Sequence, residues 1–167
     1  GAVKTPQLYK CAISLAGVSD LSELLAHSIF DDSTAASREL MRAHIGDPAR
    51  SRRELDEVSP LKHAAQIQIP LLIAHGEDDT RVLPSQSKDM VKAVQALGKP
   101  VEWMPFEKAG HGFFWIRDEA KYLAAVLKFL DRHIGDPKET ATASKSTEPP
   151  EGQTKPEEAA AGPSAGE

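Results

Sequence analysis

The chain has 167 residues, enough for one domain with a hydrophobic core. Its net charge of −5 argues against a nucleic-acid partner, and its apolar runs are far shorter than the ~20 residues of a membrane span. The single cysteine, Cys11, cannot form an internal disulfide, and the N-terminus shows no secretory signal pattern. We therefore expect neither nucleic acid nor a membrane as a partner, and the sequence does not predict the compartment.

Three short apolar runs, with helical patterns between them, predict an α/β fold for residues 1–135. The runs at 11–16, 69–74 and 101–106 are expected to be strands, and the middle one should be buried on both faces. Because strands and helices alternate along the chain, the strands should form a parallel sheet with right-handed crossovers.

Helices are expected wherever apolar residues recur at helical spacing. They should cover 21–27, 33–45, the segment from Pro84 to Gly98, and a last segment from about Asp118 to Gly135. The helix after Pro84 is expected to present an apolar face made of Met90, Val91, Val94 and Leu97. The last helix is expected to bury Tyr122, Leu123, Val126, Leu127 and Leu130.

Residues 136–167 differ in composition from the rest of the chain. They contain no Val, Ile, Leu, Met or aromatic residue, and seven acids against three lysines make the segment strongly acidic. Such a segment cannot bury enough apolar surface to offset its ordering entropy. We expect a disordered, acidic tail rich in Pro, Ala and Glu after a folded domain at 1–135.

Two polar loops follow the second and third predicted strands. Asp78 and Asp79 come after the strand at 69–74, and His111 stands between two glycines after the strand at 101–106. The carboxyl ends of parallel strands are where ligands and catalytic groups gather in open α/β sheets. An acid loop followed by a histidine loop is the order of an α/β-hydrolase catalytic triad. The competing interpretation of an Asp in this loop is an Asx-turn.

These motifs resemble the C-terminal end of the catalytic domain of the prolyl oligopeptidase family of serine peptidases. The resemblance covers about residues 1–135, and three segments carry most of it. They are His75-Gly76-x-x-Asp79-x-x-Val82, Gly110-His111-Gly112, and Tyr9-Lys10-Cys11-Ala12-Ile13-Ser14 leading into Gly17-Val18-Ser19-Asp20. It implies the C-terminal part of an α/β-hydrolase fold, three parallel strands with flanking helices, with Asp79 as triad acid and His111 as general base. Asp78 is then left to the turn, and His75 to a structural role at the strand end.

The resemblance also implies a substrate site. Arg81 would hold a carbonyl group of a short peptide substrate, and Val18 and Val82 would line the pocket for the side chain before the scissile bond. The alternative for Arg81 is a solvent-exposed loop cation. Phe113, Phe114 and Trp115 either wall the site or belong to the core. No spacing typical of metal ligands and no nucleotide-binding loop is present, so we expect no metal and no cofactor.

The serine of the triad is not where the family would place it. We expect no Gly-x-Ser-x-Gly nucleophile elbow in these 167 residues, so the chain resembles a fragment that begins just after its own nucleophile. We expect its partner to be the missing N-terminal part of the same protein, and the chain alone to be inactive. Two alternatives remain open: an esterase or acyl hydrolase on the same fold, and a non-catalytic remnant that acts as a binding module.

Overall fold

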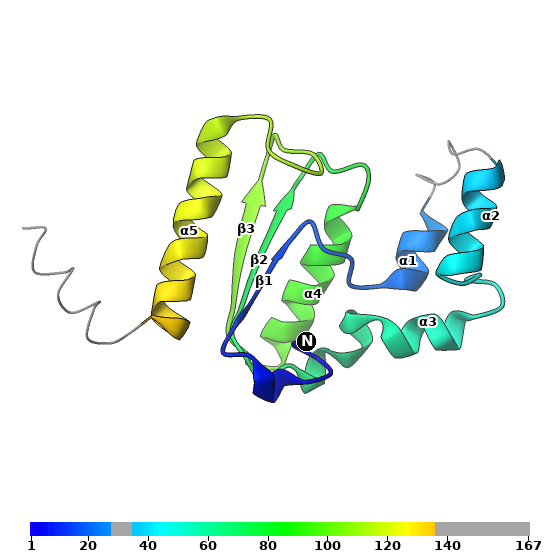
Figure 1. The fold of residues 1–167 in the computed structure, drawn as a ribbon, viewed down its shortest axis with the longest axis horizontal. Helices are drawn as coiled ribbons and strands as arrows, with labels where there is room; N and C mark the ends of the chain where they lie inside the picture. Colours follow the sequence, from blue (N-terminus) through cyan, green and yellow to red (C-terminus); the bar gives the residue numbers. More distant parts are fainter. Residues whose placement is uncertain (28–34, 136–167) are drawn as a thin grey trace, which may run out of the picture. The chain divides into compact units, whose positions relative to one another are not determined.

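The computed structural model describes residues 1–27 and 35–135, which form one compact unit from Gly1 to Gly135 (Figure 1). The predicted tail at 136–167 and the predicted helix start at 33–34 lie outside the described residues. No helix in the described part of the chain combines the length and the apolarity needed to cross a membrane.

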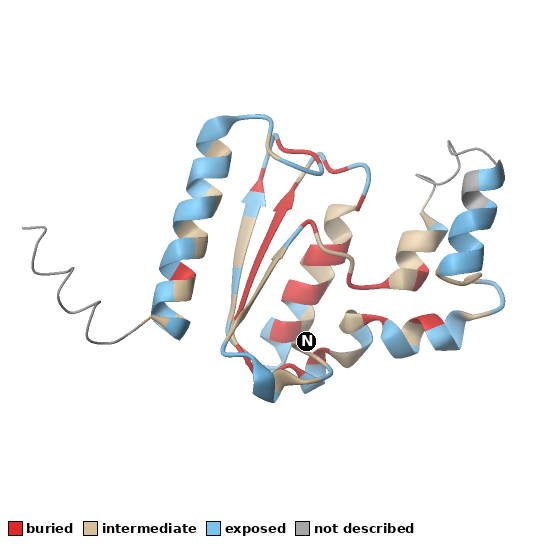
Figure 2. Ribbon diagram, viewed as in Figure 1, coloured by how far each residue is buried: buried red, intermediate tan, exposed pale blue. Residues whose placement is uncertain are grey.

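A three-stranded parallel sheet is the centre of the fold, as predicted. Its strands are β1 (Ala12–Leu15), β2 (Leu71–Gly76) and β3 (Val101–Phe106), in the spatial order β1-β2-β3. Every residue of β2 is buried, whereas β1 is half-buried with an exposed Leu15 (Figure 2). The strand buried on both faces is therefore the central one, which agrees with its uninterrupted apolar sequence.

Two helices cover opposite faces of the sheet (Figure 1). The first, α4 (Pro84–Ala96), begins at the predicted proline and packs Met90, Val91 and Val94 against β2. The second, α5 (Ile116–Ile134), lies on the other face, where Tyr122 packs against a buried cluster that includes Phe106. The hydrophobic core is thus divided by the sheet into two layers.

The connection between β1 and β2 is a helical excursion. It contains α1 (Leu21–Ala26), α2 (Ala35–His44), α3 (Arg52–Val58) and a 3₁₀ segment, η3 (Pro60–Gln66); a shorter 3₁₀ turn, η1 (Pro6–Leu8), precedes β1. Asp20 caps the start of α1, because its Oδ1 accepts a hydrogen bond from Glu23 N at 3.0 Å.

The prediction for the buried face of the last helix is partly wrong. Leu123 is 51% exposed and Leu127 68% exposed, whereas Phe129, which the pattern left out, is the helix residue that is fully buried. Apolar residues occur on more of α5 than the one face that packs against the sheet, and Leu123 and Leu127 lie on the part that is exposed. Periodicity alone could not tell which apolar edge meets the sheet.

Leu97 is a second exception. It is 47% exposed, because α4 ends at Ala96 and Leu97 is its C-cap, outside the regular helical spacing. Gly98 follows with a positive φ of 65°, so the predicted terminator acts as expected.

Candidate active site

The register of the sheet brings the acid and histidine loops together. Gly76 at the end of β2 pairs with Phe106 at the end of β3, so the chain leaves both strands at the same edge of the sheet. His111 Nδ1 donates a hydrogen bond to Asp79 Oδ2 at 2.9 Å. The structure therefore places the two predicted catalytic residues in direct contact although they are 32 residues apart in sequence.

Gly76 is required at this junction by the closeness of the two loops. A Cβ at Gly76 would lie 2.2 Å from the carbonyl oxygens of both Ala109 and Gly110, which no side chain can tolerate. The positive φ angles among the described glycines are those of Gly46 and Gly98, so the turn itself does not demand glycine here. Close approach of the backbones is the physical reason for this residue.

The carboxylate of Asp79 is almost fully enclosed, with 2% of the residue exposed. Its Oδ1 accepts hydrogen bonds from the backbone N–H groups of Arg81 at 2.8 Å and Val82 at 2.9 Å, while Oδ2 accepts from His111. Burial by itself raises the pKa of Asp79, but the bonds from the Val82 amide, His111 and the Arg81 amide outweigh it and hold the pKa below its ordinary value. The carboxylate is therefore ionised at neutral pH.

The Asx-turn and the histidine contact coexist, because they use different oxygens of the same carboxylate. Asp79 closes the turn with Oδ1 and faces His111 with Oδ2. Asp78, to which we assigned the turn, lies at its exposed corner and donates its backbone N–H to Ala109 O at 3.0 Å. The sequence alone presented these two roles as alternatives.

His75 is a contact of Asp79 that the sequence did not predict. It is completely buried, and its Nε2 lies 3.1 Å from Asp79 Oδ2. The sequence offered one signal for this contact: His75 belongs to the same motif as Asp79 and stands four residues before it. From the resemblance we had assigned it only a structural role at the strand end.

The three predicted substrate-binding residues lie in different surroundings. Arg81 is exposed, Val82 is 7% exposed, and Val18 is half-buried. Val18 lines an apolar cavity of about 160 Å³ whose floor includes Ile13 on β1 and Leu72 on β2; Val82 is not among the residues that line this cavity. The described residues thus leave Arg81 free to reach a ligand but do not join the two valines in one pocket.

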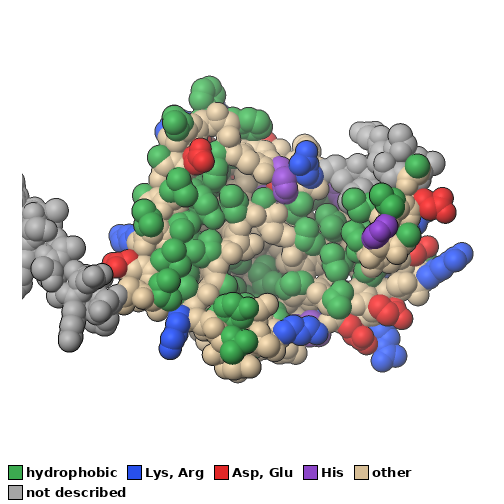
Figure 3. Space-filling model, in the orientation of Figure 1, with side chains coloured by type: hydrophobic (Ala, Val, Ile, Leu, Met, Phe, Trp, Pro, Cys, Tyr) green, Lys and Arg blue, Asp and Glu red, His purple; other side chains and the backbone are tan. Residues whose placement is uncertain are grey.

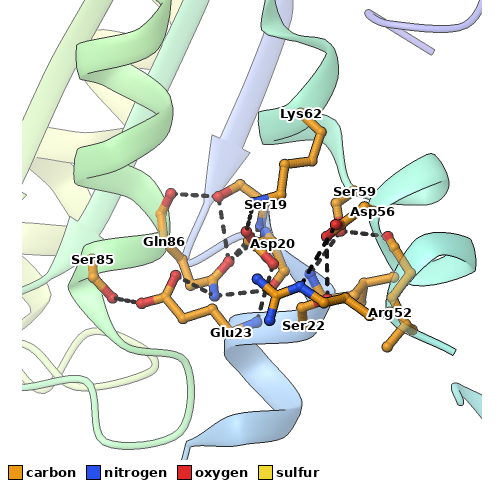
Figure 4. A network of polar contacts seen from close by, with 12 residues as sticks. Ser19, Asp20, Ser22, Glu23, Arg52, Asp56, Ser59, Lys62, Ser85 and Gln86 are labelled. Atoms are coloured by element: carbon orange, nitrogen blue, oxygen red, sulfur yellow. Dashed lines mark hydrogen bonds and ion pairs between the residues drawn. The ribbon is translucent and has the colours of Figure 1, made fainter. Parts of the chain in front are cut away.

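A buried polar network holds the loop after β1 against the start of α4 (Figure 4). Gln86 Oε1 accepts hydrogen bonds from Ser19 N at 2.8 Å and Asp20 N at 2.7 Å, and its Nε2 donates to Asp20 O at 3.0 Å and Glu23 Oε2 at 3.1 Å. Lys62 adds an ion pair to Asp20 at 2.6 Å. The network positions the loop that carries Val18 beside the helix that follows the acid loop.

The aromatic residues after His111 divide between core and surface. Phe113 packs against Phe106 and Tyr122, with ring centroids 4.9 Å and 5.4 Å away, whereas Phe114 is 72% exposed and Trp115 57% exposed. Burial raises the pKa of Tyr122. Figure 3 shows many apolar side chains on one face of the molecule.

Neither a metal centre nor a nucleophile elbow is evident in this part of the chain. Among the described residues, no group of three or more His, Cys, Asp or Glu side chains could hold a metal ion. The letters Gly-x-Ser-x-Gly do occur once in the sequence, at Gly162-Pro163-Ser164-Ala165-Gly166. That segment lies outside the described residues and follows the acid and the histidine. The sequence from 136 to 161 before it contains no Val, Ile, Leu, Met or aromatic residue, so its sequence context is not that of an elbow.

A parallel sheet whose adjacent strand ends carry a buried acid and a partly exposed histidine defines the C-terminal part of an α/β-hydrolase fold. A sequence profile of the prolyl oligopeptidase family matches residues 1–137, and the chain belongs to that family.

Three similar proteins are named as peptidases. Dipeptidyl aminopeptidase BIII from Pseudoxanthomonas mexicana is 35% identical over 137 residues, which are 81% of this chain and 20% of that protein. An acylaminoacyl peptidase from Pyrococcus horikoshii superposes with a TM-score of 0.69 at 26% identity, over 81% of this chain and 22% of its own. A puromycin-hydrolyzing peptidase from Mycobacterium tuberculosis superposes with a TM-score of 0.70 at 28% identity, over 80% of this chain and 20% of its own. The chain therefore spans about a fifth of the length of these relatives.

Proposed function

We propose that this chain supplies the acid and the general base of a serine peptidase that cleaves short peptides. The observation that carries the proposal is the contact of His111 Nδ1 with a buried, ionised Asp79 at 2.9 Å. In a triad this contact fixes the tautomer of the histidine and stabilises the imidazolium that forms during acyl transfer. The second ring nitrogen, Nε2, would then accept the proton of a serine and return it to the leaving amine.

The serine is proposed to come from a segment outside these 167 residues. The relatives are about five times longer than the matched region, and an elbow lies before the acid in α/β-hydrolases. A peptide substrate is supported by the names of the relatives and by the exposed position of Arg81 next to the acid. An arginine fork can hold a peptide carbonyl in register.

An esterase is the second candidate, because an acid–histidine pair of this kind serves the hydrolysis of esters as well as of peptides. One similar structure is named as a puromycin-hydrolyzing peptidase, so assays should include substrates other than ordinary peptides. Cleavage of a peptide amide by the longer protein would support the peptidase, whereas cleavage of a small chromogenic ester without cleavage of the amide would support the esterase.

The test begins with the coding sequence before Gly1, which should encode Gly-x-Ser-x-Gly after an apolar strand. In the longer protein, Asp79→Asn should lower kcat by about 10⁴-fold, the loss known for a triad acid that leaves its histidine in the wrong tautomer. Asp78→Asn is the matched control. It removes the neighbouring charge from an exposed position and should leave kcat within about threefold, as expected for a surface change.

Two results would contradict the proposal. One is a larger loss with Asp78→Asn than with Asp79→Asn, which would move the acid to the other carboxylate. The other is full activity of the His111→Ala variant, which would exclude the pair from catalysis. The chain of 167 residues alone should remain unlabelled by a fluorophosphonate probe, Ser164 included, because its acid–base pair has no nucleophile to activate.

A further inference from the structure

His75 fills a site between the acid loop and α4 in which each ring nitrogen has a partner. Nε2 lies 2.8 Å from the carbonyl oxygen of Val82 and 3.1 Å from Asp79 Oδ2. On the other side of the ring, Nδ1 lies 2.6 Å from the hydroxyl of Ser87 in α4. No part of His75 is exposed, and Ser87 is 2% exposed, so water does not compete for these bonds.

These neighbours determine where the proton of the ring resides. The two neighbours of Nε2 are a carbonyl oxygen and an ionised carboxylate, which can only accept hydrogen bonds, so Nε2 must carry a proton. In the neutral ring Nδ1 is then unprotonated, and it accepts a hydrogen bond from the Ser87 hydroxyl. His75 is thus held in the Nε2–H form by its surroundings.

The Nε2–H group completes the set of donors around the carboxylate of Asp79. Oδ1 is held by the backbone N–H groups of Arg81 and Val82, and Oδ2 is shared by His111 and His75. A carboxylate with donors on both oxygens cannot rotate without breaking a bond in a dry site. Without His75, one donor would remain on Oδ2, and that donor, His111, is exposed to solvent.

We propose that His75, held by Ser87, is a positioning residue that fixes Oδ2 of Asp79 toward His111. The inference rests on the proposed function, because the orientation of the carboxylate matters for turnover only if Asp79 and His111 perform the chemistry. His75 does not touch the substrate. It acts through Asp79, as the residues behind other catalytic groups do.

The test is a pair of substitutions in the active, longer protein. In His75→Gln the side-chain amide reaches about as far as Nε2 and keeps a donor for Asp79, whereas in His75→Asn the shorter amide reaches only the Ser87 end. We expect His75→Asn to lower kcat by about 10- to 100-fold, the effect of losing one hydrogen bond to a charged group, with KM within about twofold. His75→Gln should keep at least about a third of kcat.

A matched control uses a histidine distant from the site. His63 in η3 contacts the Glu57 carbonyl oxygen at 3.0 Å, and His63→Asn should leave kcat unchanged. Because His75 is buried, thermal unfolding of each variant is measured alongside. Ser87→Ala tests independently whether the orientation of His75 matters. It removes only the hydroxyl that binds Nδ1 and should lower kcat by about 3- to 10-fold.

The ring nitrogens of His75 can also be observed directly by ¹⁵N NMR of the wild-type protein, with protonated Nε2 and unprotonated Nδ1 as the expected result. A proton on Nδ1 with a bare Nε2 would overturn the inference. Equal losses in His75→Gln and His75→Asn, or an unchanged kcat in His75→Asn or Ser87→Ala, would also overturn it. In each of those cases Asp79→Asn would still be inactive, whereas failure of the proposed function would leave Asp79→Asn active.

Discussion

Arg81 has two roles that a substitution can separate: its backbone N–H binds Asp79, and its side chain is proposed to bind substrate. Its backbone N–H donates to Asp79 Oδ1 at 2.8 Å, while its side chain is exposed. A change to alanine retains the first role and removes the second. The carboxylate of Asp79 should consequently keep its orientation in Arg81→Ala, and any loss of activity then reports on the guanidinium alone.

In the longer protein, Arg81→Ala is expected to lower kcat/KM for longer peptides while sparing small chromogenic esters. The lost contact is to the substrate backbone, and a hydrogen bond to a charged group is worth about 1.5–3 kcal/mol, or about 10- to 100-fold. Steady-state kinetics on both substrate types make the comparison. Equal losses on peptides and esters would instead indicate that the side chain supports the loop.

At the scale of elements, the junction between the β1–α1 loop and α4 depends on Gln86. This side chain is 1% exposed and bonds both the N–H and the C=O of Asp20, as well as Ser19 N and Glu23. Its partners lie 63 to 67 residues earlier in the sequence. One side chain therefore joins two segments that the chain brings together only on folding.

Gln86→Leu should lower the free energy of unfolding by about 2–4 kcal/mol, because buried backbone N–H groups would lose their acceptor. Gln86→Glu keeps the acceptor but turns a carboxyl oxygen toward Asp20 O and the carboxylate of Glu23. Protonation of the new carboxyl removes that repulsion, so this variant should recover stability relative to the wild type as the pH falls. Urea denaturation at several pH values measures both effects. A Gln86→Leu variant as stable as the wild type would show that the network contributes little.

At the scale of the whole molecule, the described fold leaves apolar surface without cover. β1 is an edge strand with an exposed Leu15, and α5 exposes Ile116, Leu123, Leu127 and Ile134. Uncharged apolar edges and large apolar patches are features that stable monomers avoid. The chain also spans only about a fifth of the length of the relatives compared above, and we expect further segments of a longer protein to cover part of this surface.

We expect the isolated chain to aggregate, to be molten, or to be stable only beside the N-terminal segment that we propose. Sedimentation and thermal melting test this directly. Leu127→Glu, at a position 68% exposed on α5, should reduce self-association, whereas the matched change Leu97→Glu, on a 47% exposed residue at the end of α4, should not. A monodisperse wild-type monomer with a sharp, cooperative transition would show that the three strands form a self-sufficient domain.

The sequence by itself predicted the three strands, the helices α1, α2, α4 and α5, the buried middle strand, and the acid and histidine of the candidate site. Each of these depends on a local signal: an apolar run, a helical period, or a short motif that follows a strand. The choice of Asp79 over Asp78 came from the motif, and the contact with His111 agrees with it.

Only the tertiary structure decided which apolar edge of α5 meets the sheet, why residue 76 is glycine, and which donors surround Asp79. The partners in these contacts come from different elements: the loop after β3 approaches Gly76, Ser87 in α4 holds His75, and Gln86 holds the loop after β1. Such contacts form when distant segments pack, and no periodicity or spacing within one segment encodes them. Burial and hydrogen bonding in three dimensions assigned these roles because they depend on neighbours in space, which the order of residues along the chain does not specify.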